Sequence, residues 1–106
     1  MKGMDFGDLM KQAQKMTKEM SKIQTALKDR VVEGAAGGVV KAFVNGQQEV
    51  VGIKIDKQAV NPDDVEMLQD LVQAAVNQAL KKAKEMAQAE LAKASGGLVP
   101  PNLLGM

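Results

Sequence analysis

A regular run of apolar residues near the N-terminus predicts a helix that is too long for a small sheet to cover. Six residues recur at alternating spacings of four and three: Leu9, Ala13, Met16, Met20, Ile23 and Leu27. This heptad seam predicts a helix over about residues 8–29. At ~1.5 Å of rise per residue, roughly 22 residues span about 33 Å. We therefore expect part of the helix to project or to pack on a partner.

The middle of the chain has an apolar period of two, which indicates strands. The runs that alternate are Val40, Ala42 and Val44, and then Val51, Ile53 and Ile55. Asn45-Gly46 separates them and tolerates the positive φ values of a tight hairpin turn. A short run at 31–33 precedes a glycine-rich stretch at 34–38. These features predict a three-stranded antiparallel meander.

A second long helix is predicted after the strands. Asn61 can cap it, Pro62 suits the first helical position, and the acids that follow complement the helix dipole. The apolar stripe continues to about Ala94, and Ser95-Gly96-Gly97 ends it. We expect residues 1–97 to form a single α+β domain of order α-β-β-β-α, and residues 98–106 to form a flexible tail.

The composition favours a homodimer and argues against an enzyme. Aromatic residues make up only 2% of the chain, and because each aromatic side chain buries a large area, apolar burial is expected across a subunit interface instead. Cys and His are absent, which removes thiolate nucleophiles, disulfides and the usual zinc ligands. We expect no catalytic residues, no metal, no cofactor and no small-molecule substrate.

Two other groups of residues have alternative interpretations. The acids Asp63, Asp64 and Asp70 could form a carboxylate site, but acids in the first turns of a helix ordinarily offset its dipole. The glycines at 34, 37 and 38 could suggest a phosphate loop, but they lack the spacing of one and lie between strands, which favours a turn.

The N-terminus carries Asp5 and leads into a charged helix, so we expect no signal peptide. No apolar run approaches the roughly 18 residues of a membrane span. A cytoplasmic protein without a membrane partner is expected.

Charge is distributed unevenly although the net charge is only +1. Four lysines step by 4, 3 and 4 residues on the side of the first helix opposite the seam: Lys11, Lys15, Lys18 and Lys22. Across about 16 Å such a row can follow a phosphate backbone, although a row of lysines is more often only a solvated face. Further basic residues lie at the end of this helix and in the second helix: Lys28, Arg30, Lys81, Lys82 and Lys84.

Several ordered motifs resemble the YbaB/EbfC family of bacterial nucleoid-associated proteins, over nearly the whole chain from Phe6 to Leu104. They are LMKQAQKM at 9–16, GGVVK at 37–41, VNG at 44–46, VEMLQDLV at 65–72, AAVNQALKKA at 74–83 and GGL at 96–98. The resemblance implies a tweezer-like homodimer whose helical arms bind double-stranded DNA with low or modest sequence specificity in the nucleoid, with effects on nucleoid organisation and gene expression. It assigns DNA contact first to the four-lysine row and less securely to the other basic residues.

An alternative function uses the seam itself. Met10, Met16 and Met20 are adaptable apolar side chains, and they could pack in a core or interface or grip another protein. In that case the chain would be an interaction module, and DNA binding would be incidental.

Overall fold

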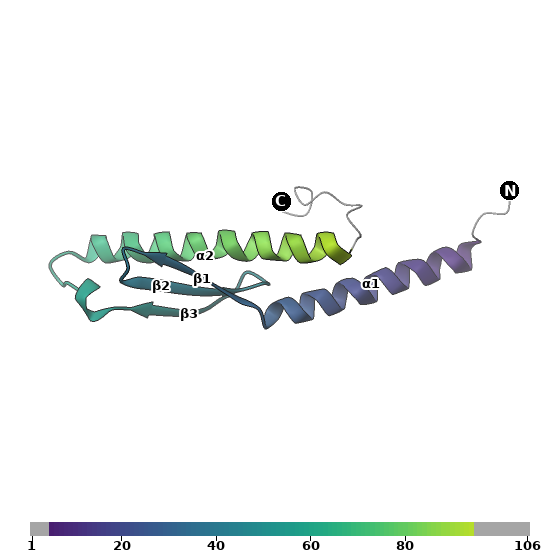
Figure 1. The fold of residues 1–106 in the computed structure, drawn as a ribbon, viewed down its shortest axis with the longest axis horizontal. Helices are drawn as coiled ribbons and strands as arrows, with labels where there is room; N and C mark the ends of the chain where they lie inside the picture. The colour runs from purple at the N-terminus through teal and green to yellow at the C-terminus, as the bar shows by residue number, and fades with distance from the viewer. Residues whose placement is uncertain (1–4, 95–106) are drawn as a thin grey trace.

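The computed structural model describes residues 5–94 as a helix, three strands and a second helix (Figure 1). The elements are α1 (Phe6–Lys28), β1 (Val31–Ala36), β2 (Val40–Asn45), β3 (Val50–Ile55), a short 3-10 helix η1 (Lys57–Ala59) and α2 (Val65–Ala94). The predicted α-β-β-β-α order is confirmed. The Ser-Gly-Gly stop at 95–97 and the predicted tail at 98–106 lie outside the described residues.

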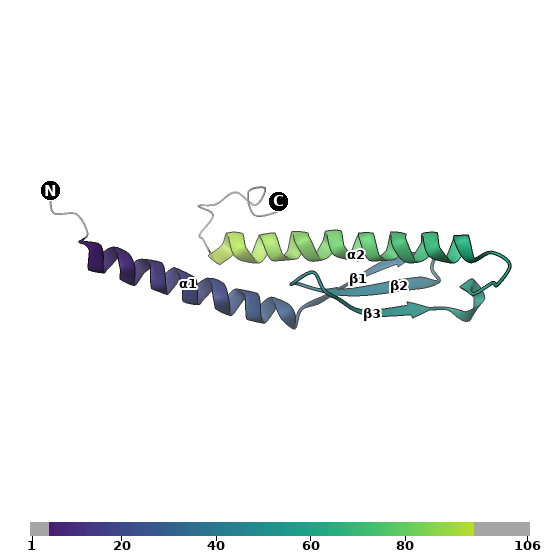
Figure 2. The same ribbon diagram turned by 180° about the vertical axis from the view of Figure 1, so that it is seen from behind.

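The sheet has the order β1-β2-β3 with both pairings antiparallel, and α2 packs along one face of it (Figures 1 and 2). The buried core consists of Val40, Ala42 and Val44 from β2 and Ala75, Ala79 and Ala83 from α2. The three alanines follow a spacing of four and form one face of the helix. Because these side chains are small, α2 lies close to the sheet.

Gly34 of β1 shows how close that approach is. A Cβ at this position would lie 2.3 Å from the carbonyl oxygen of Ala75 and 2.5 Å from the backbone nitrogen of Ala79. No side chain fits between the two elements there. The glycine is therefore required by helix–sheet packing.

Helix α1 extends away from the rest of the chain as an arm (Figures 1 and 2). The molecule measures 75 × 21 × 16 Å, and its radius of gyration is 19.7 Å, against about 13 Å for a compact domain of this length. Leu27 is the one residue of α1 that is buried. The prediction that part of this helix projects is confirmed.

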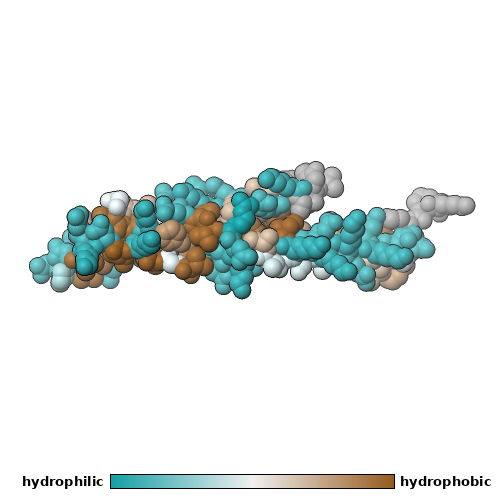
Figure 3. Space-filling model, turned by 60° about the horizontal axis from the view of Figure 1, so that its bottom comes forward, coloured by the Kyte–Doolittle hydropathy of each residue, from teal (hydrophilic) through white to brown (hydrophobic). Residues whose placement is uncertain are grey.

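Strand β3 leaves apolar side chains uncovered. Ile53 pairs with Ala42 and Ile55 pairs with Val40, so both lie on the face of the sheet that α2 covers. They nevertheless remain 44% and 41% exposed, and Val51 is 53% exposed, because α2 packs mainly over β1 and β2. Figure 3 shows apolar surface gathered over this part of the molecule, whereas the arm is largely hydrophilic.

Both hairpin turns lie in the predicted segments, but in the second the positive φ is at another residue. The tight turn is at Gly37-Gly38, whose φ values are +60° and +70°, and the N–H of Val39 donates to the carbonyl oxygen of Ala36 at 3.2 Å. A turn also forms at the predicted Asn45-Gly46, where the N–H of Gln48 donates to the carbonyl oxygen of Asn45 at 2.9 Å, but neither Asn45 nor Gly46 takes a positive φ. There the loop contains residues 46–49, and Gln48 takes the positive φ of +64°.

The helix starts also differ from prediction. Helix α2 begins at Val65, and the N–H of Met67 donates to the carboxylate of Asp64 at 3.2 Å. Asn61 instead accepts a bond from the N–H of Asp63 at 3.0 Å and shapes the preceding turn, so Pro62 is not a helical residue. A carboxylate at the cap also benefits from the helix dipole, which favours the later start. Helix α1 begins at Phe6, two residues early, capped by Asp5.

Candidate nucleic-acid interface

The row Lys11, Lys15, Lys18 and Lys22 lies along α1, and all four side chains are exposed. Within residues 5–94, none of the four takes part in an ion pair. The helix that carries them stands clear of the sheet (Figure 1). The arrangement is a line of four unneutralised cations on a rigid support.

The apolar seam on the opposite side of α1 is buried only where the arm meets the rest of the chain. Leu27 is 2% exposed, whereas Met20 is 37%, Met16 59% and Leu9 49% exposed. Met10, at 45%, is exposed as well. The methionines therefore do not pack in the core of the chain, and their packing in an interface stays a prediction.

The base of the arm is held by the loop between β2 and β3. The backbone N–H of Gly46 donates to two carbonyl oxygens, that of Leu27 at 2.8 Å and that of Arg30 at 2.9 Å. The side-chain amide of Gln47 donates to the carbonyl oxygen of Gln24 at 2.7 Å. Of these three carbonyl groups, only that of Leu27 is among the last four of α1, which have no i+4 partner within the helix.

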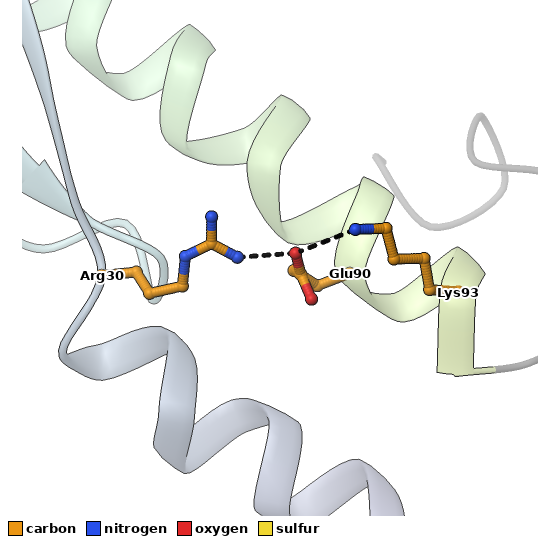
Figure 4. A network of polar contacts seen from close by, with 3 residues as sticks. All are labelled: Arg30, Glu90 and Lys93. Atoms are coloured by element: carbon orange, nitrogen blue, oxygen red, sulfur yellow. Dashed lines mark hydrogen bonds and ion pairs between the residues drawn. The ribbon is translucent and has the colours of Figure 1, made fainter.

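A second connection joins the base of the arm to α2 (Figure 4). The Nη1 of Arg30 lies 2.6 Å from the Oε1 of Glu90, and the Nζ of Lys93 lies 3.7 Å from the same oxygen. The hydrogen bond from Arg30, and then the charge of Lys93, lower the pKa of Glu90 below its ordinary value. Arg30 is thus partly neutralised, which makes it a weaker candidate for DNA contact than the arm lysines.

The remaining predicted basic residues do not form one surface with the row. Lys28 is exposed in the last turn of α1. Lys81, Lys82 and Lys84 are exposed on α2; Lys81 and Lys84, three residues apart, share a face of this helix, whereas Lys82 is turned away from Lys81 by about 100°. Lys82 donates to the carbonyl oxygen of Glu33 at 2.9 Å. Lys84 lines a hollow at the base of the arm together with Gln24 and Leu27.

Acidic residues gather at the end of the molecule opposite the arm. Residues 54–70, from the end of β3 to the start of α2, contain five acids and two lysines. Figure 1 places this segment at the far end of the sheet from α1. The molecule therefore has a positive and a negative end.

The other candidate groups carry structural roles. Asp64 caps α2, Gly37 and Gly38 form a turn, and Gly34 allows close packing. Over residues 5–94, no three His, Cys, Asp or Glu side chains gather in a way that could hold a metal ion. Over the same residues, no helix is both long and apolar enough to cross a membrane.

Sequence reasoning missed the residues that hold the arm. Asn45-Gly46 was predicted to form a hairpin turn, and this prediction gave no indication that Gly46 contacts Leu27. Glu90 gave no signal, since 60 positions separate it from Arg30.

An elongated α-β-β-β-α subunit with a lysine-bearing helical arm defines the class of protein. The model of the YbaB/EbfC DNA-binding family matches residues 1–98. The chain belongs to this family of nucleoid-associated DNA-binding proteins, as the sequence resemblance indicated.

Relatives and a solved structure agree with this assignment. A nucleoid-associated protein of Thermoanaerobacter pseudethanolicus is 50% identical over 102 residues, which cover 95% of this chain and 92% of the relative. One of Thermodesulfovibrio yellowstonii is 53% identical over 102 residues, covering 95% and 87%. The crystal structure of an uncharacterized protein of Helicobacter pylori matches with a TM-score of 0.77 and 30% identity, covering 90% of this chain and all of that one. The predicted fold is thereby confirmed.

Proposed function

We propose that this protein binds double-stranded DNA as a homodimer, with low or modest sequence specificity, in the cytoplasmic nucleoid. The observation that carries the proposal is the line of four exposed lysines on α1, none of them in an ion pair within the described residues. Such a line can neutralise successive phosphates and release their counterions. Nucleoid organisation and gene expression are the processes it would affect.

The side chains of the arm favour the DNA backbone over the bases. Lysine is a point charge without the planar fork with which arginine reads guanine. Phe6 and Phe43 are the only aromatic residues of the chain, so platforms for stacking unpaired bases are few. A duplex recognised through its phosphates, with little dependence on sequence, fits this surface.

The uncovered apolar side chains of β3 support the homodimer. Val51, Ile53 and Ile55 lie beside a core made only of small and medium-sized side chains. Pairing two such surfaces would remove this apolar area from water. The burial would stabilise the dimer by roughly 25 cal/mol for each Å² of apolar surface. It would also give one particle two arms, which doubles the number of phosphate contacts and matches the tweezer-like shape that we expect.

A salt titration of binding to random duplex DNA tests the proposal. Each phosphate contact lowers the slope of log K against log salt by about 0.9, so eight lysines on two arms predict a slope of roughly −7. Absence of binding to the duplex at low salt would overturn the proposal. A measured mass of one chain would overturn its dimeric part.

A second candidate function is an interaction module that grips another protein through the exposed seam. The exposure of Leu9, Met10, Met16 and Met20 favours it. An apolar contact would be nearly insensitive to salt, so the same titration separates the two functions. Neither function involves catalysis or a cofactor.

A further inference from the structure

The contacts at the base of α1 suggest a role beyond attachment. We propose that Gly46, Gln47 and Glu90 are positioning residues that hold the arm in one direction, so that its lysine row meets DNA already aligned. We call these three residues, with their partners Gln24, Leu27 and Arg30, the arm joint. The inference rests on the proposed DNA binding, but its structural part can be tested without DNA.

Gly46 brings the sheet into backbone contact with the arm. A Cβ on Gly46 would lie 2.7 Å from both the Cβ and the carbonyl oxygen of Leu27. Neither of those atoms can move without shifting the end of the helix. Gly46 is buried, and its N–H bonds to both Leu27 and Arg30. The helix end and the loop are therefore in direct backbone contact at Leu27 and Gly46, and a change of angle would break this contact.

Asn45 gives the loop the shape that this contact needs. Its side chain is 2% exposed, and its Oδ1 accepts bonds from the N–H groups of Gln47 and Glu49, both at 3.0 Å. Its Nδ2 donates to the carboxylate of Glu49 at 3.0 Å. These hydrogen bonds within the loop fix its conformation, so that Gly46 and the side chain of Gln47 face α1.

The arm is held on both sides of Leu27. Gln47 binds the carbonyl oxygen of Gln24, nearly one turn before Leu27. Glu90 of α2 binds Arg30, which follows the helix. Two attachments six residues apart, one to the sheet and one to α2, resist a swing about the single buried contact. The arm is consequently fixed in direction as well as in place.

The length of the arm magnifies any change at the joint. Lys11 is 16 residues from Leu27, or about 24 Å along the helix. A tilt of about 10° would move it by roughly 4 Å, which is comparable to the ~3.4 Å of helix axis that each phosphate of one strand occupies. Holding the direction before binding lowers the ordering cost of association. The joint would therefore raise affinity without contacting DNA.

Glu90 allows a test in which the joint and simple electrostatics predict opposite results. Glu90→Ala removes a negative charge, so charge alone predicts tighter binding to a polyanion. Loss of the Arg30 attachment predicts weaker binding. Glu85→Ala is the matched control, because Glu85 is exposed on the same helix and forms no ion pair within residues 5–94. We expect Glu85→Ala to bind as tightly as the parent or tighter, and Glu90→Ala to bind at least about threefold more weakly.

The direction of the arm can be measured directly, because the chain has no cysteine of its own. Spin labels on Gln12→Cys in α1 and Gln73→Cys in α2, diluted with unlabelled protein, report the distance between arm and body within one chain. We expect one narrow distribution for the parent and a broader or shifted one for Gly46→Ala, Gln47→Ala and Glu90→Ala. Gln47→Ala is included because it removes only a side-chain hydrogen bond and should leave the fold intact.

The outcomes separate the two proposals. Distributions that are unchanged in all three variants would overturn the arm joint, whether or not the protein binds DNA. A narrow parent distribution that broadens in the variants would support the joint, even if the parent failed to bind duplex DNA and the proposed function fell. Tighter DNA binding by Glu90→Ala than by Glu85→Ala would also contradict the inference.

Discussion

The backbone N–H of Gly46 donates to the carbonyl oxygen of Leu27 at 2.8 Å, where a side chain on Gly46 would collide with Leu27. This contact joins the last turn of the arm to the loop between β2 and β3. The lysine row begins only five residues before it, at Lys22. The short segment from Lys22 to Leu27 therefore connects the surface proposed for DNA to the loop of the sheet.

The lysine row should control affinity for DNA without affecting assembly. Lys15→Glu combined with Lys22→Glu is expected to weaken binding at least about tenfold across unrelated sequences, because phosphate contacts become repulsions. A gel shift with mixed duplexes measures this, and light scattering checks that the mass is unchanged. Lys54→Glu with Lys57→Glu makes the same change of charge at the other end of the molecule. Equal losses in both double variants would show that net charge, and not the arm, determines binding.

Gly34 should be sensitive even to the smallest side chain. Gly34→Ala places a Cβ 2.3 Å from the carbonyl oxygen of Ala75, and overpacking of this kind typically costs about 1–3 kcal/mol. Gly52→Ala is the control, since its nearest neighbour would be at an ordinary 3.6 Å. Urea unfolding measures the free energy of unfolding of both. Equal stability of the two variants would contradict the tight helix–sheet packing.

The apolar surface of β3 should mediate the homodimer. Ile53→Asp is expected to shift the protein toward a single chain, because a carboxylate would replace an apolar contact in the interface. Analytical ultracentrifugation measures the change. Val60→Asp alters a side chain that is 54% exposed but lies outside β3, and we expect it to leave the mass unchanged. A dimer that survives Ile53→Asp would place the interface elsewhere.

Acid should weaken the attachment of the arm to α2. Arg30 and Lys93 lower the pKa of Glu90, so its folded pKa lies below the unfolded one. The contribution of Glu90 to stability is then fully present above its ordinary pKa of 4.5 and is lost as the pH falls through the lowered value. The difference in stability between the parent and Glu90→Ala, measured by urea unfolding from pH 7 to pH 3, should be constant at first and then shrink. If the difference in stability between the parent and Glu90→Ala grew as the pH fell, this prediction would be contradicted.

Much of the fold could be predicted because the periods of the sequence are regular. The heptad seam predicted both the long first helix and its projection, and the period of two placed β2 and β3. The first strand was predicted only over 31–33, whereas β1 continues through Gly34 to Ala36. Periodicity indicates which side of a strand an apolar residue faces, but not whether anything covers that side. For this reason the exposure of Ile53 and Ile55 emerged only when the position of α2 was known.

The candidate site was predicted in part. The four arm lysines follow directly from helical spacing, and their exposure agrees with it. Their support at Gly46 and Glu90 depends on contacts between distant segments, which no local pattern records. At Asn45-Gly46 the sequence suggested that the glycine provides conformational freedom, whereas in the structure Gly46 has no positive φ and approaches Leu27 closely.

The opposite charges at the two ends of this 75 Å molecule have a consequence before any contact forms. In the field of a polyanion, the lysine-rich arm is attracted while the acidic segment at 54–70 is repelled. The pair of forces exerts a torque that turns the particle arm-first as it approaches. Added salt confines this turning to within roughly a Debye length, about 8 Å at physiological ionic strength.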